Sequence, residues 1–84
     1  MNKKIKDLID SNLVKMELFC DNVSFDTEHG ILFLRITLDK KEGYIDLDTV
    51  TTASRIINKL IDENDFIEKK FILEIWAKEK GEIL

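Results

Sequence analysis

The pair Ser54-Arg55, at the start of the stretch SRIINKLIDENDFIEKKFILEI, contains the one side-chain combination that suggests catalysis. A serine acts as a nucleophile only when a base lies within hydrogen-bonding reach. The sequence places no histidine near Ser54, and Arg55 stays protonated at any relevant pH, so it cannot be that base. We therefore expect no catalysis here, and we predict that Arg55 belongs to a partner-binding surface.

Two further groups have side chains of the types that bind metals, but neither is a complete ligand set. His29 is the only histidine, and it follows two acids in the segment DTEHG without a second histidine or cysteine nearby. The acidic break at residues 62–65 lacks the glycine and the terminal glutamate of an EF-hand loop. Cys20 is the only cysteine, so we expect a buried, inert side chain. The sequence predicts no metal and no cofactor.

The composition is that of one acidic domain. Thirteen basic and 17 acidic residues give the 84-residue chain a net charge of −4. A chain of this length forms one domain, so we expect residues 1–84 to fold as a single unit. The lack of a signal peptide, of a long apolar run and of a second cysteine predicts a cytoplasmic location. Phosphate neutralisation favours positive proteins, so the negative charge favours a basic protein partner over nucleic acid.

Hydrophobic spacing predicts two helices. Residues 2–13 place Ile5, Leu8 and Ile9 at helical intervals. The second helix follows Asp46, whose carboxylate is suited to cap the first turn. Its apolar stripe is expected at Val50, Ala53, Ile57 and Leu60.

Alternating apolar residues predict three strands, at residues 14–21, 31–39 and 70–77. The first two form an antiparallel hairpin whose connection turns at Gly30. The order α-β-β-α-β predicts an α+β two-layer sandwich, with both helices on one face of a three-stranded, mainly antiparallel sheet.

The same alternation predicts a second sheet face with large apolar side chains. Phe33, Ile72 and Trp76 point to this face, together with Phe19 and Ile31. Exposed apolar patches of this size tend to mark interfaces, so we expect contact with a partner, with a second domain or with another copy. The alternative is that the first helix, the C-terminal tail or a bent first strand covers the face.

We also predict one charge pair on that second face. Arg35 and Glu74 both occupy the register of their strands that points away from the core, so we expect them to pair across the sheet.

Residues 14–75 resemble the N-terminal domain of the bacterial ribosome maturation factor RimP family in the order and spacing of their motifs. The segments VKMELF, LFLRITLDKKEG and IDLDT take the places of the family's first two strands and helix start. Ser54-Arg55, Asp62, Asp65, Ile67 and the strand FILEI follow in register. The resemblance ends at WAKEKGEIL, where the family has Ser-Ser-Pro-Gly. We expect the family's second, SH3-like domain to be absent. Two explanations are compatible with this expectation: the chain is a shortened piece of a longer protein, or it is a natural single-domain protein.

The resemblance implies a non-enzymatic factor that assists assembly of the small ribosomal subunit by binding ribosomal protein and rRNA, without a cofactor. It directs attention to a partner-binding surface at Arg55, Asp62 and Asp65, to which the second sheet face adds Phe33, Ile72 and Trp76. The competing hypothesis is a standalone adaptor that forms homodimers through that sheet face.

Overall fold

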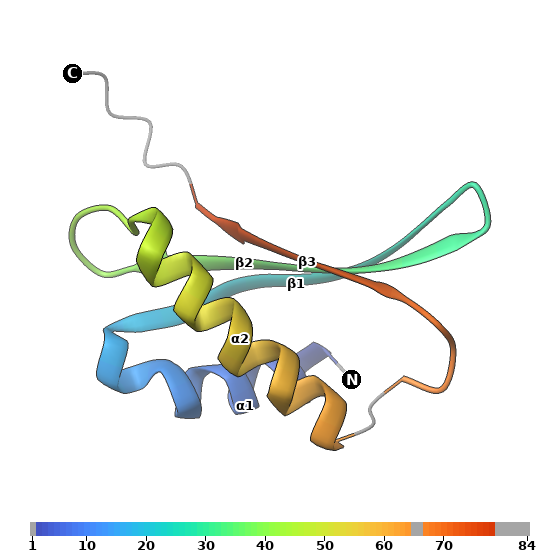
Figure 1. Ribbon diagram of the computed structural model, residues 1–84, viewed down its shortest axis with the longest axis horizontal. Helices are drawn as coiled ribbons and strands as arrows, with labels where there is room; N and C mark the ends of the chain where they lie inside the picture. The colour runs from blue at the N-terminus through green and yellow to red at the C-terminus, as the bar shows by residue number, and fades with distance from the viewer. Residues whose placement is uncertain (1, 65–66, 79–84) are drawn as a thin grey trace.

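The computed structural model describes residues 2–64 and 67–78, and its elements follow the predicted α-β-β-α-β order (Figure 1). A short 3-10 turn, η1, joins the first helix to the first strand. The elements are α1 (Asn2–Leu13), η1 (Val14–Met16), β1 (Leu18–Glu28), β2 (Ile31–Lys40), α2 (Leu47–Asn64) and β3 (Ile72–Ala77).

The sheet is mixed, with the strand order β1-β2-β3. β1 and β2 form the predicted antiparallel hairpin, but β3 runs parallel to β2. The antiparallel prediction is therefore confirmed for the hairpin but not for β3. The reason is that α2 carries the chain back to the end of the sheet where β2 began, so the next strand repeats the direction of β2.

The first strand differs from its predicted bounds at both ends. Val14 starts the 3-10 turn, and Glu17 has a left-handed φ of 62°, so the strand begins only at Leu18. It then continues to Glu28, through residues that the sequence predicted as a connection. A β-bulge explains the error: the pairing register shifts between Cys20 and Asn22, so the inward residues change from even to odd numbers.

Only His29 and Gly30 connect the hairpin strands, and both have positive φ, of 53° and 78°. This conformation matches the two-residue turns that suit the twist of antiparallel strands. The predicted turn at Gly30 is confirmed.

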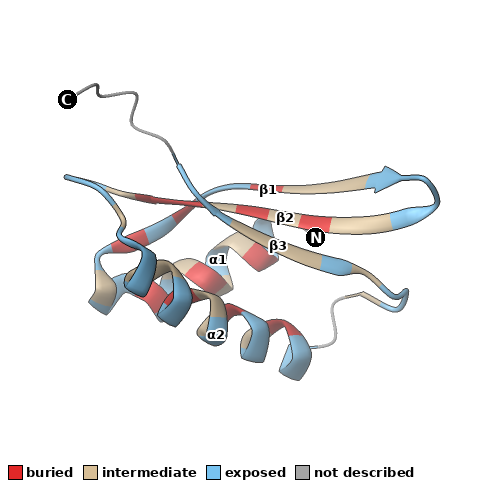
Figure 2. Ribbon diagram, turned by 45° about the horizontal axis from the view of Figure 1, so that its top comes forward, coloured by how far each residue is buried: buried red, intermediate tan, exposed pale blue. Residues whose placement is uncertain are grey.

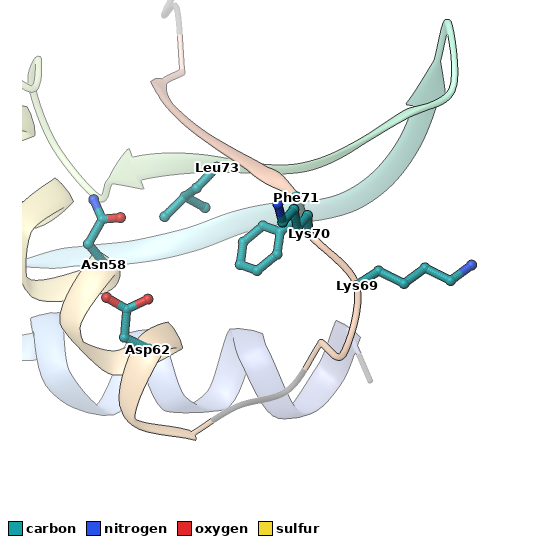
Figure 3. Close-up of a pocket in the computed structure, with 6 residues that line it drawn as sticks. All are labelled: Asn58, Asp62, Lys69, Lys70, Phe71 and Leu73. Carbon is teal, nitrogen blue, oxygen red and sulfur yellow. The ribbon is translucent and has the colours of Figure 1, made fainter.

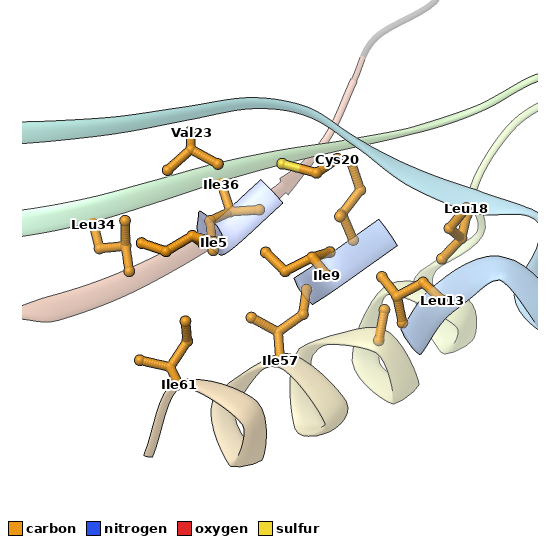
Figure 4. Packing of buried hydrophobic residues seen from close by; sticks show 12 residues of the cluster. Ile5, Ile9, Leu13, Leu18, Cys20, Val23, Leu34, Ile36, Ile57 and Ile61 are labelled. Atoms are coloured by element: carbon orange, nitrogen blue, oxygen red, sulfur yellow. The ribbon is translucent and has the colours of Figure 1, made fainter. Parts of the chain in front are cut away.

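The hydrophobic core lies between the sheet and the helices, which lie on the same side of it (Figures 2 and 4). α2 contributes Ala53, Ile57 and Ile61, while the predicted Leu60 is only half-buried. Neither helix of the described residues is long and apolar enough to span a membrane. The buried apolar residues are Ile5, Ile9, Leu13, Leu18, Cys20, Val23, Leu34, Ile36, Leu38, Ala53, Ile57 and Ile61.

Asp10 of α1 fastens the helix to the bulge of β1. Its Oδ1 accepts a hydrogen bond from the backbone N–H of Cys20 at 2.6 Å, and its Oδ2 accepts one from Lys6 Nζ at 2.6 Å. The predicted burial of Cys20 is confirmed, and burial raises the pKa of its thiol to about 11. The thiol is therefore protonated at neutral pH, as expected for a packing residue.

Asp46 caps α2 as predicted. Its Oδ1 accepts the backbone N–H of Thr49 at 2.7 Å, and its backbone oxygen accepts the N–H of Val50. Hydrogen bonds from the Thr49 side chain and amide lower the pKa of Asp46. These bonds satisfy amides of the first turn and define where α2 begins.

Candidate functional site

The sheet face opposite the helices forms the candidate binding surface. Side chains alternate along β2, so Phe33, Arg35 and Thr37 point away from the buried Leu34 and Ile36. The register then decides which residues of the other strands lie beside them on this face. We use the term open face for Phe19, Ser24, Asp26, Glu28, Ile31, Phe33, Arg35, Thr37, Ile72, Glu74 and Trp76.

Arg35 lies in the middle of the open face and binds three carboxylates. Its Nε donates to Glu74 Oε1 at 2.8 Å, and its Nη1 donates to Glu28 Oε2 at 2.8 Å and to Asp26 Oδ2 at 3.3 Å. Its guanidinium carbon lies 4.5 Å from the centroid of the Phe33 ring, a cation–π distance. The predicted Arg35–Glu74 pair is confirmed.

The contacts of Asp26 and Glu28 with Arg35 were not predicted. Both acids belong to the part of β1 beyond the bulge, which the sequence had placed in a loop. The available clue was that the two acids are two residues apart and directly precede the turn at Gly30. In a strand this spacing puts both side chains on the same face of the sheet, beside β2.

The carboxylates outnumber the guanidinium in this cluster. Three acids around Arg35 leave an excess of two negative charges. The hydrogen bonds that Arg35 donates to Glu28 and Glu74 raise the pKa of Arg35, and the bond to Glu28 lowers the pKa of Glu28. Both shifts favour the charged forms of Arg35 and Glu28, and the excess of carboxylates gives the open face a negative potential.

Apolar side chains flank this charged centre. Ile72 lies beside Phe33, and Trp76 lies beside Thr37 on the other side of the Arg35–Glu74 pair. Ile72 is 45% exposed and Trp76 is 56% exposed. The alternative in which the first helix covers this face is wrong, because α1 packs on the opposite face, while most of the C-terminal tail lies outside the described residues.

The structure divides the predicted site residues between two surfaces. Phe33, Ile72 and Trp76 share the open face, whereas Arg55 and Asp62 are exposed on α2, on the helix side of the sheet. Arg55 and Asp62 are seven residues apart, which places them on one stripe of the helix. Asp65 lies outside the described residues.

A groove between α2 and the start of β3 brings Asp62 close to the apolar side chains of Phe71 and Leu73 (Figure 3). It measures about 490 Å³. Phe71 and Leu73 extend toward α2 in this groove, and both are only half-buried. The groove is lined by Asn58, Asp62, Lys69, Lys70, Phe71 and Leu73.

The segment around His29 does not form a metal site in the structure. Asp26 and Glu28 are both engaged by Arg35, and His29 lies in the hairpin turn. Among residues 2–64 and 67–78, no three His, Cys, Asp or Glu side chains are grouped to hold a metal ion.

The sequence was compared with models of known protein families. The model described as RimP N-terminal domain matches residues 7–77, which is most of the chain and includes all three strands. The match covers both the Arg35 cluster and the groove beside Asp62. The chain belongs to the RimP N-terminal domain family, the amino-terminal domains of ribosome maturation factors.

Proposed function

We propose that this domain assists maturation of the small ribosomal subunit by binding a basic ribosomal protein through its open face. It does so in the cytoplasm, without a cofactor and without catalysis. The family supports a role in ribosome maturation, and the net charge of −4 supports a basic partner. Exposed lysines such as Lys3 and Lys4, which lie on α1 and away from the acidic cluster, contact rRNA.

The observation that carries this proposal is the cluster of three carboxylates around Arg35, flanked by exposed apolar side chains. A negative surface accelerates encounter with a positively charged partner and disfavours other acidic molecules. Ile72 and Trp76 then supply apolar area that gains free energy when it is buried in a complex. Charge and apolar area together define a surface that suits a basic protein.

Co-sedimentation with immature small ribosomal subunits, at low and at moderate salt, tests the proposal. We expect saturable binding that Glu28→Lys weakens, because replacing a carboxylate with a cation cancels both excess negative charges of the cluster. Asp7→Lys is the matched control, since it changes the net charge equally at an exposed position of α1. Equal binding by both variants, or no binding by the wild-type chain, would contradict the proposal.

The second candidate function is that of an adaptor that forms homodimers through the open face. The exposure of Ile31, Ile72 and Trp76 favours it, because apolar residues on neighbouring strands are often covered by another copy. Light scattering on the same preparation distinguishes the two functions. A stable dimer that Trp76→Ser dissolves, combined with no affinity for immature subunits, would favour the adaptor.

A further inference from the structure

The outer edge of β3 offers backbone groups for pairing. Among the described residues, β3 pairs only with β2. The N–H of Lys78 donates to the carbonyl oxygen of Leu38 at 2.7 Å, so Lys78 directs its backbone groups toward β2. Because these groups alternate in direction along a parallel ladder, those of Leu73, Ile75 and Ala77 point outward.

The two edges of the sheet differ in how they are protected. Edge strands usually avoid pairing by means of bulges, charges or prolines. β1 has a bulge between Cys20 and Asn22 and carries several acids. β3, with the sequence ILEIWA, has one charge, on Glu74, which Arg35 pairs. Its apolar residues resemble those of a central strand, yet none is fully buried.

The surroundings of this edge indicate what kind of strand would fit. On the helix side, Phe71 and Leu73 form the apolar part of the groove, and Lys69 and Lys70 at its end disfavour further cations there. On the open face, Glu74 and Trp76 lie beside the edge, next to the cluster with its two excess negative charges. Apolar side chains therefore suit the groove, and basic ones suit the open face.

We propose that β3 accepts an extended, basic segment of a partner protein as a fourth strand, with apolar and basic side chains alternating along that segment. Main-chain hydrogen bonds to Leu73 and Ile75 give the affinity, and the different chemistry of the two faces gives the selectivity. A second copy of the chain is a poorer occupant, because its own β3 brings Glu74 and no base. The inference rests on the proposed function and specifies how the partner is held.

A peptide titration tests the edge directly. The probe is the acetylated peptide KVRVKVRV, added to the ¹⁵N-labelled chain, with the acidic peptide EVDVEVDV as the control. We expect the basic peptide to slow hydrogen exchange at the outward amides of Leu73 and Ile75, because those amides gain acceptors. Equal binding of the acidic peptide, or shifts confined to β1, would overturn the proposal.

Two variants test the edge while leaving the backbone pairing of β3 with β2 in place. Ala77→Pro removes an outward N–H at an exposed position, and we expect it to weaken peptide binding about five- to tenfold. Glu74→Gln removes the acid beside the edge, and we expect a loss of about threefold. Glu63→Gln is the matched control on exposed α2 surface, where affinity stays at the wild-type value. Wild-type affinity in both edge variants would overturn the proposal.

Co-sedimentation with immature small subunits separates this inference from the proposed function. Weaker co-sedimentation of Ala77→Pro supports the inference. If wild-type and Ala77→Pro chains co-sediment equally, the inference fails while the proposed function stands. If the peptide binds as expected but no subunit binds, the proposed function fails while the edge site stands. Dimers that Ala77→Pro abolishes would overturn the inference, because the occupant would then be a second copy.

Discussion

The two faces of the sheet are made by alternate residues of the same strands, yet they differ in almost every physical property. In β2, Leu34, Ile36 and Leu38 are fully buried under the helices. The intervening residues, Phe33 and Arg35 among them, lie on the open face and remain partly exposed. A period of two therefore separates a surface that stabilises the domain from one that is available for binding.

This difference determines where substitutions are tolerated. Burial of apolar area is the main favourable contribution to folding, so the helix-covered face determines the stability. Exposed ion pairs contribute little to stability, because water and salt screen them. The Arg35 cluster can therefore change with little effect on the fold, and its effect is on charge and on binding.

The largest expected effect is from Ile36→Ala, on the buried face. The substitution leaves a cavity beneath the helices, and we expect the free energy of unfolding to fall by about 2–5 kcal/mol. Urea denaturation followed by circular dichroism measures this loss. The neighbouring Thr37→Ala, on the open face, is the control, with an expected change within about 0.5 kcal/mol. Equal losses in the two variants would mean that the faces do not differ as described.

Asp10→Ala has the next largest expected effect, because it detaches α1 from the bulge. The backbone N–H of Cys20 loses its acceptor, and we expect a loss of about 1–3 kcal/mol in the free energy of unfolding. Asp7→Ala, three residues earlier on an exposed part of α1, provides the comparison. A similar stability of the two variants would show that the Asp10 contact does not hold the helix to the sheet.

The buried face also predicts a loss of stability at alkaline pH. Burial raises the pKa of Cys20 from 9.0 to about 11, so above pH 9.0 the unfolded chain loses this proton before the folded one does. The folded state therefore loses stability as the pH rises from 9.0 toward about 11, the pKa of Cys20 in the folded chain. Cys20→Ala removes this component of the pH dependence, which denaturation at pH 8 and pH 10 would measure. If stability depends on pH equally in Cys20→Ala and in the wild-type chain, the alkaline loss does not come from Cys20.

The smallest expected effect belongs to the open face and occurs at acidic pH. Arg35 lowers the pKa of Glu28 below 4.5, so the unfolded chain binds this proton first as the pH falls. The contribution to stability is present above pH 4.5 and is lost as the pH falls through the lowered pKa. In Arg35→Gln we expect less of this acid sensitivity, measured by thermal unfolding at pH 5 and pH 3. Identical pH profiles would show that the pair is not maintained in solution.

Much of the fold could be predicted, because amphipathic spacing and capping are local properties. The Asp46 cap, the turn at Gly30 and the shared face of Arg35 and Glu74 all follow from spacing alone. The length of β1 could not be predicted in this way. The bulge between Cys20 and Asn22 changes the phase of the alternation, so the second half of the strand looks irregular in the sequence.

The candidate site was predicted less completely, because it depends on register and on strand direction. Phe33, Ile72 and Trp76 were placed on one face by alternation, and the structure agrees. Asp26 and Glu28 were missed because the second half of β1 was predicted as a connection. The groove beside Asp62 depends on how far α2 lies from β3, a tertiary distance that no spacing in the sequence encodes.

The parallel placement of β3 has a consequence for the order in which the domain folds. β1 and β2 are neighbours in sequence and can close a hairpin early, whereas Arg35 and Glu74 are 39 residues apart. During synthesis the hairpin and α2 therefore emerge before β3, and β2 remains an open edge until the last strand docks. A chain that pauses at this stage exposes the β2 edge to other nascent chains, and docking of β3 covers that edge and leaves β3 as the outer strand of the sheet.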